Sequence, residues 1–377
     1  MDGDKRHSWN VGRILARRGA LIWVILAMSC SWALAQTAQE TVSQKQEEDA
    51  LTKLEKSPWV IAPIFSSNPK LGTSLGAMVG YIHYFDEKSR PTIFNVMGQY
   101  TSTDSIVAAL GTRSSFDEDH QRLIAGLVYG NIKNDYNDYL GTGIPLKNNA
   151  EMHAFITRYT YRVQGNWFVG AQGIYQNFTV TGQTDFDDQV LDFLGVKPFK
   201  SAGLGLVLQE DSRDNEFMPT KGWFLNLNNV AYRESLGSQS DYDFYRLELR
   251  YYLEHGDRNV LAFRQMNAFT NDAPSAARAS VQLRGYKIGQ YSADNMSSIE
   301  AEERYRFAEK WTATVFIGVA CLYGGGLSCS DSVNLFPAWG AGVQYILKPK
   351  EGIVLNLEYA QGKDGNYGVI LKMGYAY

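Results

Sequence analysis

Strict alternation of apolar and polar side chains, repeated along most of the chain, constrains the fold of this protein more than any other feature. In "YDFYRLELRYYLEHG" Tyr245, Leu247 and Leu249 fall on one face, and Arg246 and Glu248 fall on the other. A two-residue period is that of a half-buried β-strand. Most of the segments that show it exceed the ~5–6 residues common in globular proteins. Sixteen segments show this period, at 58–68, 71–85, 91–102, 104–116, 120–134, 151–163, 166–181, 200–212, 221–234, 241–254, 259–270, 295–307, 311–321, 335–347, 352–361 and 367–377.

Two architectures can use such strands. A secreted sandwich or solenoid would turn the apolar faces inward, whereas a membrane barrel would turn them toward lipid. The even strand count and the alternation of short turns with longer loops favour the barrel. Aromatic residues also gather at strand ends, as in interfacial girdles: Trp167, Trp223, Trp311, Tyr345 and Tyr359. We therefore predict an all-β fold, a 16-stranded antiparallel transmembrane β-barrel in the bacterial outer membrane, with lipid around it.

The two ends of the chain suit export and insertion. Residues 1–35 have a basic start, the apolar run "ALIWVILAMSCSW" and a small-x-small site at Ala33-Leu34-Ala35, which predicts a cleavable signal peptide rather than a permanent anchor. A short polar periplasmic segment follows at 36–57, and the barrel is expected over 58–377. The last segment ends on aromatic Tyr377, like strands read by the outer-membrane assembly machinery, on which we expect this chain to depend for its own insertion.

Neither the composition nor the motifs indicate nucleic-acid binding, catalysis or metal binding. The net charge is −4 over 377 residues, so nothing indicates nucleic-acid binding. The histidines after the signal do not stand in a nucleophile–base pattern. The acidic stretch "TDFDDQVLDF" lacks the register of a metal loop. We expect neither an enzyme nor a metal or cofactor site.

The polar faces of the predicted strands carry the charges that we expect in the lumen. Eight are basic and four acidic, a mixture that argues against a simple anion pore. Glu303 is the exception, because it falls on the predicted lipid face, where an ionised group is costly. The predicted lumen charges are Arg158, Arg162, Arg246, Glu248, Arg250, Arg264, Glu300, Glu302, Arg304, Arg306, Glu358 and Lys372.

The connection between the eleventh and twelfth segments, which contains "SVQLRGYKIGQYSADN", is far longer than a hairpin turn. With both termini periplasmic it starts on the cell surface. One interpretation is an ordinary surface loop with a solvated arginine. The other is a loop that folds into the lumen, where Arg284 meets Glu300 or Glu302 and Gly285 and Gly289 allow sharp turns.

This loop, with Arg284, Gly285 and Tyr286, resembles the [V/L]RG[F/Y] motif of the BamA/TamA superfamily of outer-membrane assembly barrels, also called bacterial surface antigens. The resemblance implies a sixteen-stranded barrel with this loop in the lumen after strand 11. "EDSRDNEFMPTKGWFLNL" is similar to a second family motif, a periplasmic turn. "NDYLGTGIP" and "EAEERYRF" resemble further family segments. The second motif is carried by Asp211, Arg213, Asp214, Pro219, Gly222 and Trp223.

The chain departs from the family in two places. Many relatives place an aspartate, as partner of the loop arginine, where this chain has Gly318, so Glu300 or Glu302 becomes the expected partner. Relatives also carry periplasmic POTRA domains, and residues 36–57 are too few for one. A separate periplasmic partner is therefore expected. Finally, Cys321 and Cys329 flank a glycine-rich loop in an exported chain, which favours a disulfide over two free thiols.

Three functions follow from the sequence. The first, implied by the resemblance, is protein or lipid assembly or translocation at the outer membrane, which would need a weak seam between the first and last strands. Pro58 and Pro63 lie in the first strand and cannot donate backbone hydrogen bonds. The alternatives are a passive outer-membrane pore and a structural surface antigen.

Overall fold

The computed structural model describes residues 56–68, 72–136, 146–193 and 199–373. The predicted signal peptide, most of the predicted polar segment, the "NDYLGTGIP" motif and the end of the last predicted strand lie outside the described residues. Within the described part, no helix combines the length and apolar character needed to cross a bilayer.

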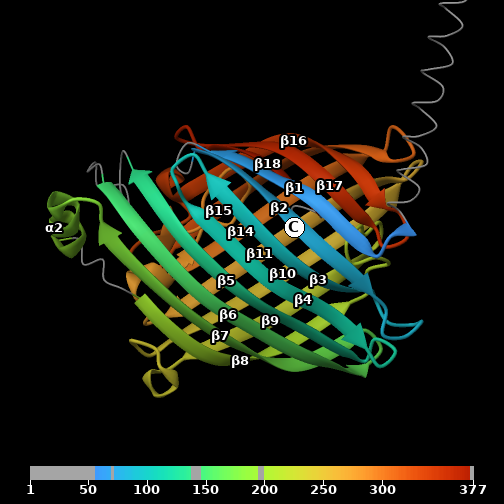
Figure 1. Ribbon diagram of the computed structural model, residues 1–377, viewed down its shortest axis with the longest axis horizontal. Helices are drawn as coiled ribbons and strands as arrows, with labels where there is room; N and C mark the ends of the chain where they lie inside the picture. Colours follow the sequence, from blue (N-terminus) through green and yellow to red (C-terminus); the bar gives the residue numbers. More distant parts are fainter. Residues whose placement is uncertain (1–55, 69–71, 137–145, 194–198, 374–377) are drawn as a thin grey trace, which may run out of the picture. The chain divides into compact units, whose positions relative to one another are not determined.

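Sixteen antiparallel strands close into a barrel in which each strand pairs with its neighbours along the chain and the last pairs with the first (Figure 1). The predicted fold is thereby confirmed. The barrel strands are β1 (Trp59–Asn68), β2 (Gly72–His83), β3 (Thr92–Thr101), β4 (Ile106–Phe116), β5 (Gln121–Tyr136), β6 (Leu146–Gln164), β7 (Trp167–Gly182), β8 (Phe199–Asp211), β9 (Gly222–Tyr232), β10 (Tyr242–His255), β11 (Asn259–Asn271), β14 (Asn295–Tyr305), β15 (Trp311–Tyr323), β16 (Leu335–Lys348), β17 (Ile353–Gly362) and β18 (Tyr367–Met373).

Small elements stand in the connections on the side opposite the short turns. The connection from β7 to β8 holds the helix α2 (Asp185–Phe193), and that from β9 to β10 holds η1 (Glu234–Leu236). The long connection from β11 to β14 contains η2 (Ser275–Ala277) and the two-residue strands β12 (Ala279–Ser280) and β13 (Ser292–Ala293). A last 3-10 turn, η3 (Ser332–Asn334), precedes β16.

One predicted boundary was wrong by several residues. The segment predicted to begin at 151 starts at Leu146, because residues 146–150 pair with 132–136 of β5. This extension carries Asn148 and Asn149 beside Lys147, so it shows no apolar alternation. Backbone pairing alone extends the hairpin there.

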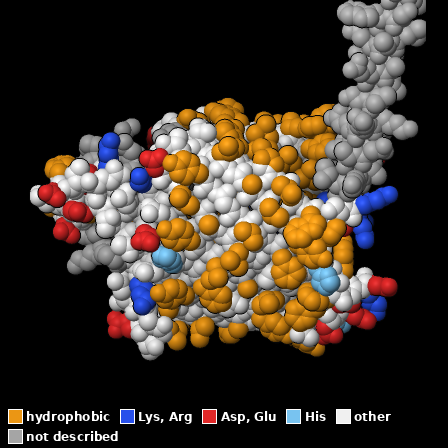
Figure 2. Space-filling view, viewed as in Figure 1, with side chains coloured by type: hydrophobic (Ala, Val, Ile, Leu, Met, Phe, Trp, Pro, Cys, Tyr) orange, Lys and Arg blue, Asp and Glu red, His pale blue; other side chains and the backbone are white. Residues whose placement is uncertain are grey.

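The apolar phase of each strand faces outward. In β15 the side chain of Ile317 is 67% exposed, whereas the neighbouring Thr314 and Phe316 are buried on the inner side. Figure 2 shows hydrophobic side chains spread over the strands of the visible face, with the charged ones gathered toward the two ends. A closed barrel with this surface satisfies every strand edge, which a hydrocarbon environment requires.

Glu303, the charge predicted on the lipid face, does lie on the outer side of β14 and has a partner. Its carboxylate accepts a hydrogen bond at 3.0 Å from Nε2 of His255, at the end of β10. The predicted phase of the strand was therefore correct. Glu303 therefore carries its charge near the polar end of the barrel, where an ionised group is less costly than at the midplane.

The first and last strands pair with each other and close the barrel. Among the described residues, β1 and β18 are paired at Phe65↔Leu371, Ser66↔Ile370 and Ser67↔Val369, whereas β1 pairs with β2 over ten positions. Pro63 lies in β1 next to this ladder and has no N–H to contribute.

Candidate functional site

The connection between β11 and β14 packs against the inner wall of the barrel. Val281, Leu283 and Tyr286 are all buried, and their neighbours come from four strands, β11, β14, β15 and β16. The N–H of Val281 donates to the carbonyl of Tyr291 at 3.0 Å, which continues the small β12–β13 hairpin. The hairpin positions the "LRGY" residues that follow Val281.

Arg284 lies among three carboxylates. Its Nη1 is 2.5 Å from Glu302 Oε2 and 3.2 Å from Glu358 Oε1, and its Nη2 is 2.9 Å from Glu300 Oε1. The arginine side chain is 7% exposed and none of the three carboxylates exceeds 2%. Its guanidinium carbon also lies 3.4 Å from the centre of the Phe316 ring. Guanidinium groups suit such forked, stacked contacts.

Glycines make room for this cluster. Gly318 pairs directly with Glu300 across β14 and β15, and a Cβ at Gly318 would lie 3.2 Å from Cγ of Glu300. Glu300 thus takes the space beside Gly318, as the sequence analysis expected of a partner of Arg284. Gly285 has a φ of +86°, and a Cβ there would meet the backbone of β17 at 3.2 Å, so both its conformation and its surroundings require glycine.

Tyr286 ties the same loop to β16 and to the β17–β18 connection. Its hydroxyl donates to the carbonyl of Pro337 at 2.6 Å and accepts from the N–H of Lys363 at 2.8 Å. Its ring covers Gly362, where a Cβ would lie 2.5 Å from the ring carbon Cζ. Gly289 has a φ of +83° but faces open space, so it serves only to turn the chain.

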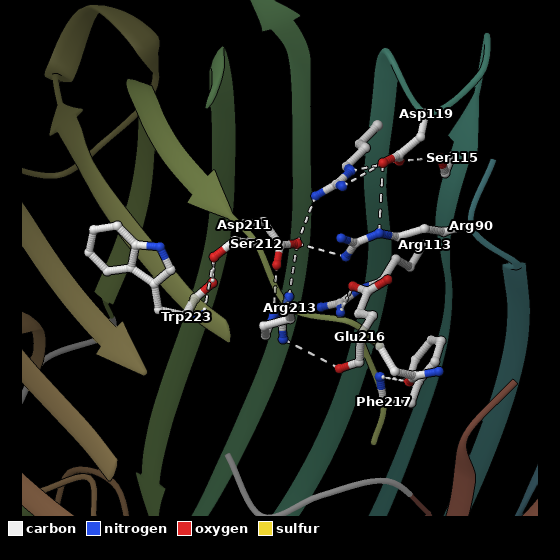
Figure 3. Close-up of polar contacts among 12 residues, drawn as sticks. Arg90, Arg113, Ser115, Asp119, Asp211, Ser212, Arg213, Glu216, Phe217 and Trp223 are labelled. Carbon is white, nitrogen blue, oxygen red and sulfur yellow. Dashed lines mark hydrogen bonds and ion pairs between the residues drawn. The ribbon is translucent and has the colours of Figure 1, made fainter. Parts of the chain in front are cut away.

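The β8–β9 turn, residues 212–221, makes a second buried charge cluster inside the barrel (Figure 3). Asp211 Oδ2 accepts from Arg90 Nη1 at 2.7 Å and from Arg122 Nη1 at 2.9 Å, and its Oδ1 accepts from Arg213 Nε at 2.8 Å. Asp119, in the β4–β5 turn, accepts from Arg122 Nη2 at 2.7 Å. Two aspartates thus join arginines from separate turns and strands.

The same turn reaches across the barrel. On one side Glu216 forms an ion pair with Arg113 of β4. On the other, the carbonyl of Pro219 accepts from Arg304 Nη1 of β14 at 3.2 Å. Asn215 Nδ2 donates to the carbonyl of Glu351, in the β16–β17 turn, at 3.3 Å. The turn therefore links strands that are far apart around the barrel wall.

The remaining motif residues shape the turn itself. Asp214 accepts from the N–H of Thr220 at 2.9 Å and from its hydroxyl at 2.8 Å. Gly222 has a φ of +97°, and a Cβ there would collide with the carbonyl of Ser212. Burial alone would raise the pKa of Glu216, but the guanidinium groups of Arg113 and Arg90 outweigh it and lower that pKa below its ordinary value. Arg122 likewise outweighs burial and lowers the pKa of Asp119.

The profile of the Omp85 superfamily domain matches residues 68–347. The chain belongs to the Omp85 superfamily. The match covers most of the barrel, including the β8–β9 turn and Arg284 with Glu300 and Glu302, and the predicted membership of the family of BamA-like barrels is confirmed. No curated protein sequence matches the chain significantly.

Solved structures with the same fold include BamA from Haemophilus ducreyi lacking POTRA domains 1–3, with a TM-score of 0.54 and 14% identity, covering 85% of this chain and 70% of that one. CdiB from Acinetobacter baumannii has a TM-score of 0.56 and 11% identity, and the match covers 84% of this chain and 59% of that one. CdiB from Escherichia coli has a TM-score of 0.53 and 9% identity, and the match covers 83% of this chain and 62% of that one. This Omp85 barrel thus spans about three fifths of each CdiB chain, and the likeness shows the fold.

Two other predicted features of this Omp85 barrel can be located. Cys321, at the end of β15, is disulfide-bonded to Cys329, with Cα atoms 5.6 Å apart. The acidic stretch at 184–193 forms α2, and Asp187 accepts from the N–H and hydroxyl of Thr184 at 3.1 and 2.7 Å. Its carboxylate caps its own helix. Within the described part of the chain, His, Cys, Asp and Glu nowhere form a group of three that could hold a metal.

Several residues of the two clusters were missed by the sequence analysis. Arg113 and Arg122 lie on the inner faces of β4 and β5. On β5 that face also carries Ile124 and Val128, so alternation did not single out Arg122. Glu358 was expected in the lumen but not as a partner of Arg284. Asp119 and Glu216 lie in turns, where side-chain direction follows no period and sequence offers no comparable indication.

Proposed function

We propose that this protein works in the bacterial outer membrane in the assembly or translocation of proteins or lipids, by lateral opening of the barrel between β1 and β18. The observation that carries the proposal is Pro63 in β1: among the described residues the pairing with β18 ends at Phe65, and Pro63 has no N–H to extend it. A proline in a strand removes a backbone hydrogen bond from the ladder, which lowers the cost of parting the wall there.

The internal clusters support an assembly role over a passive pore. Arg284 and its loop are anchored on β14 and β17, and the β8–β9 turn contacts β4 and β14. Both features place side chains in the interior of the barrel, which a wide aqueous channel would need to keep open. A separate periplasmic partner remains an expectation from the sequence.

A cross-link across the junction tests the proposal. Cysteines replacing Ser66 and Ile370 face each other across β1 and β18. Cysteines replacing Ser66 and Ser74 join β1 to β2 and give a matched control that leaves the junction free. Each variant would be reconstituted in liposomes, oxidised, and assayed for the rate at which it accelerates folding of an unfolded eight-stranded outer-membrane barrel.

The expected result is that oxidised S66C/I370C loses the acceleration and recovers it on reduction, while oxidised S66C/S74C retains it. Equal acceleration by both oxidised variants would exclude lateral opening. Large, steady single-channel currents from the unmodified protein, unaffected by the cross-link, would instead favour the passive pore.

A further inference from the structure

A cavity of about 200 Å³ lies inside the barrel, enclosed by the inner faces of β4, β5, β6, β8, β9 and β10 and by the β8–β9 turn. Seven arginines but only two glutamates are among the residues that line it. This imbalance distinguishes it from the cluster around Arg284, where three carboxylates meet Arg284, Arg304 and Lys372.

Five of the seven arginines have carboxylate partners. Arg90, Arg122 and Arg213 contact Asp211. Arg113 contacts Glu216, and Arg250 contacts Glu248. These pairs leave two arginines of the cavity wall to be accounted for.

Arg158 and Arg246 are those two, and neither forms an ion pair with a described carboxylate. Arg158 donates only to neutral groups, to Gln172 Oε1 at 3.0 and 2.6 Å and to Asn226 Oδ1 at 3.2 Å. The Nε of Arg246 is buried without a hydrogen-bond partner, and its guanidinium carbon lies 5.6 Å from the ring centre of Phe244.

Two partly buried guanidinium groups without an ion-pair partner are unfavourable, because arginine does not give up its proton and removing an ion from water carries a desolvation penalty. Glu248 lines the same cavity but already pairs with Arg250 and Arg264. The cavity could hold several waters at ~30 Å³ each, so it has space for a small ion. Its wall also offers neutral hydrogen-bonding groups in Ser114, Thr160 and Asn226.

We propose that this cavity binds a phosphate-type oxyanion, with Arg158 and Arg246 as its charged ligands. A guanidinium fork matches two oxygens of a phosphate and binds them with charge-assisted hydrogen bonds. Inorganic phosphate and the phosphate monoester of a lipid headgroup share this chemistry. The site is a separate property of the barrel, and it does not depend on lateral opening.

Thermal unfolding of the full-length protein tests the proposal in a neutral, phosphate-free detergent. Inorganic phosphate would be titrated at constant ionic strength, with chloride replacing it in the control. The parent protein should show a saturable rise in Tm. The double variant R158Q/R246Q should lose that rise yet unfold, without phosphate, at the same temperature as the parent or higher, because it no longer buries two unpaired charges.

Two further variants make the result specific. R278Q removes one positive charge outside the cavity, from a half-exposed side chain, and should respond like the parent. R246K keeps the charge but not the fork, so it should fold normally and bind phosphate about tenfold more weakly by calorimetry. An absent response in the parent, an undiminished response in R158Q/R246Q, or unchanged affinity in R246K would each overturn the site.

The source of the oxyanion is resolved by a second arm in nanodiscs. Phosphatidylcholine discs with and without phosphatidic acid would be compared for the parent and for R158Q/R246Q. Stabilisation by phosphatidic acid that requires both arginines would assign the site to a lipid phosphate. A response confined to added inorganic phosphate would assign it to the free ion. If neither probe stabilises the parent, the proposal is wrong.

Discussion

At the scale of single residues, charge balance explains how an arginine can anchor a loop inside the barrel. Glu302 is shared by Arg284 and by Arg304, whose Nε lies 2.6 Å from Oε1. Lys372 Nζ is 3.8 Å from Glu358. Three cations thus meet three carboxylates, and each depends on the others because burial makes any unpaired charge costly.

Removing the central cation should therefore be severe. R284A would leave Glu300, Glu302 and Glu358 short of one positive charge, and we expect the free energy of unfolding to fall by about 3–5 kcal/mol. Urea unfolding of the barrel in detergent micelles measures this. R278A, at a half-exposed site, is the control, with an expected change within about 0.5 kcal/mol. Similar losses in both variants would contradict the anchoring role.

A carboxylate exchange between facing residues offers a sharper test. G318D alone should destabilise the barrel, because Cβ and Cγ of Glu300 occupy the space beside Gly318. Combining it with E300G clears that space and places one carboxylate on β15, opposite its original position on β14. In a double-mutant cycle the pair should recover at least about 1 kcal/mol over the sum of the single changes. Additive losses would show that the position of the carboxylate is not interchangeable.

At the scale of elements, the β8–β9 turn connects distant parts of the barrel wall. Its Glu216 and Pro219 contact β4 and β14, and Phe217 packs with the inner cluster of Val60 and Ile353. Unlike an ordinary hairpin turn, this connection contacts strands that are far apart around the barrel wall. Its stability depends on the ionisation of its carboxylates.

Acid should release this turn before the strands unfold. The pKa values of Glu216 and Asp119 are lowered from 4.5 and 3.8. The stabilisation they contribute is therefore fully present above those ordinary values and is lost as pH falls through the lower folded values. Hydrogen exchange of residues 212–221 should rise below about pH 4 in the parent. In D119N/E216Q it should be fast at neutral pH as well; a pH-independent turn in the parent would refute the coupling.

At the scale of the whole molecule, the outer surface of the barrel is the apolar one. Ile317, at the centre of β15, and Val315 are among its most exposed apolar side chains, at 67% and 56%. Such a surface would be an aggregation hazard in water. In a bilayer it is the favourable one.

A charge placed on this surface should report depth in the membrane. I317K at mid-strand is expected to cost about 2–4 kcal/mol of folding free energy in lipid vesicles, and Y305K, at the end of β14, about 0–1 kcal/mol. Both residues are exposed to a similar extent, 67% and 55%, so the difference isolates depth. Equal costs would indicate that the band around Ile317 does not face hydrocarbon.

Sequence alone was enough for the local features: the strands, the face that each side chain occupies, and the position of Arg284 in a long connection. Alternation needs only neighbouring residues, and hence even Glu303 was assigned to the correct face. The tertiary structure decided which distant groups meet. Glu358 reaches Arg284 across 74 positions, and Arg158 and Arg246 meet in one cavity that arginines dominate. The physical reason is that such contacts depend on strand register, barrel closure and the course of the turns, none of which is encoded in the period of a single strand.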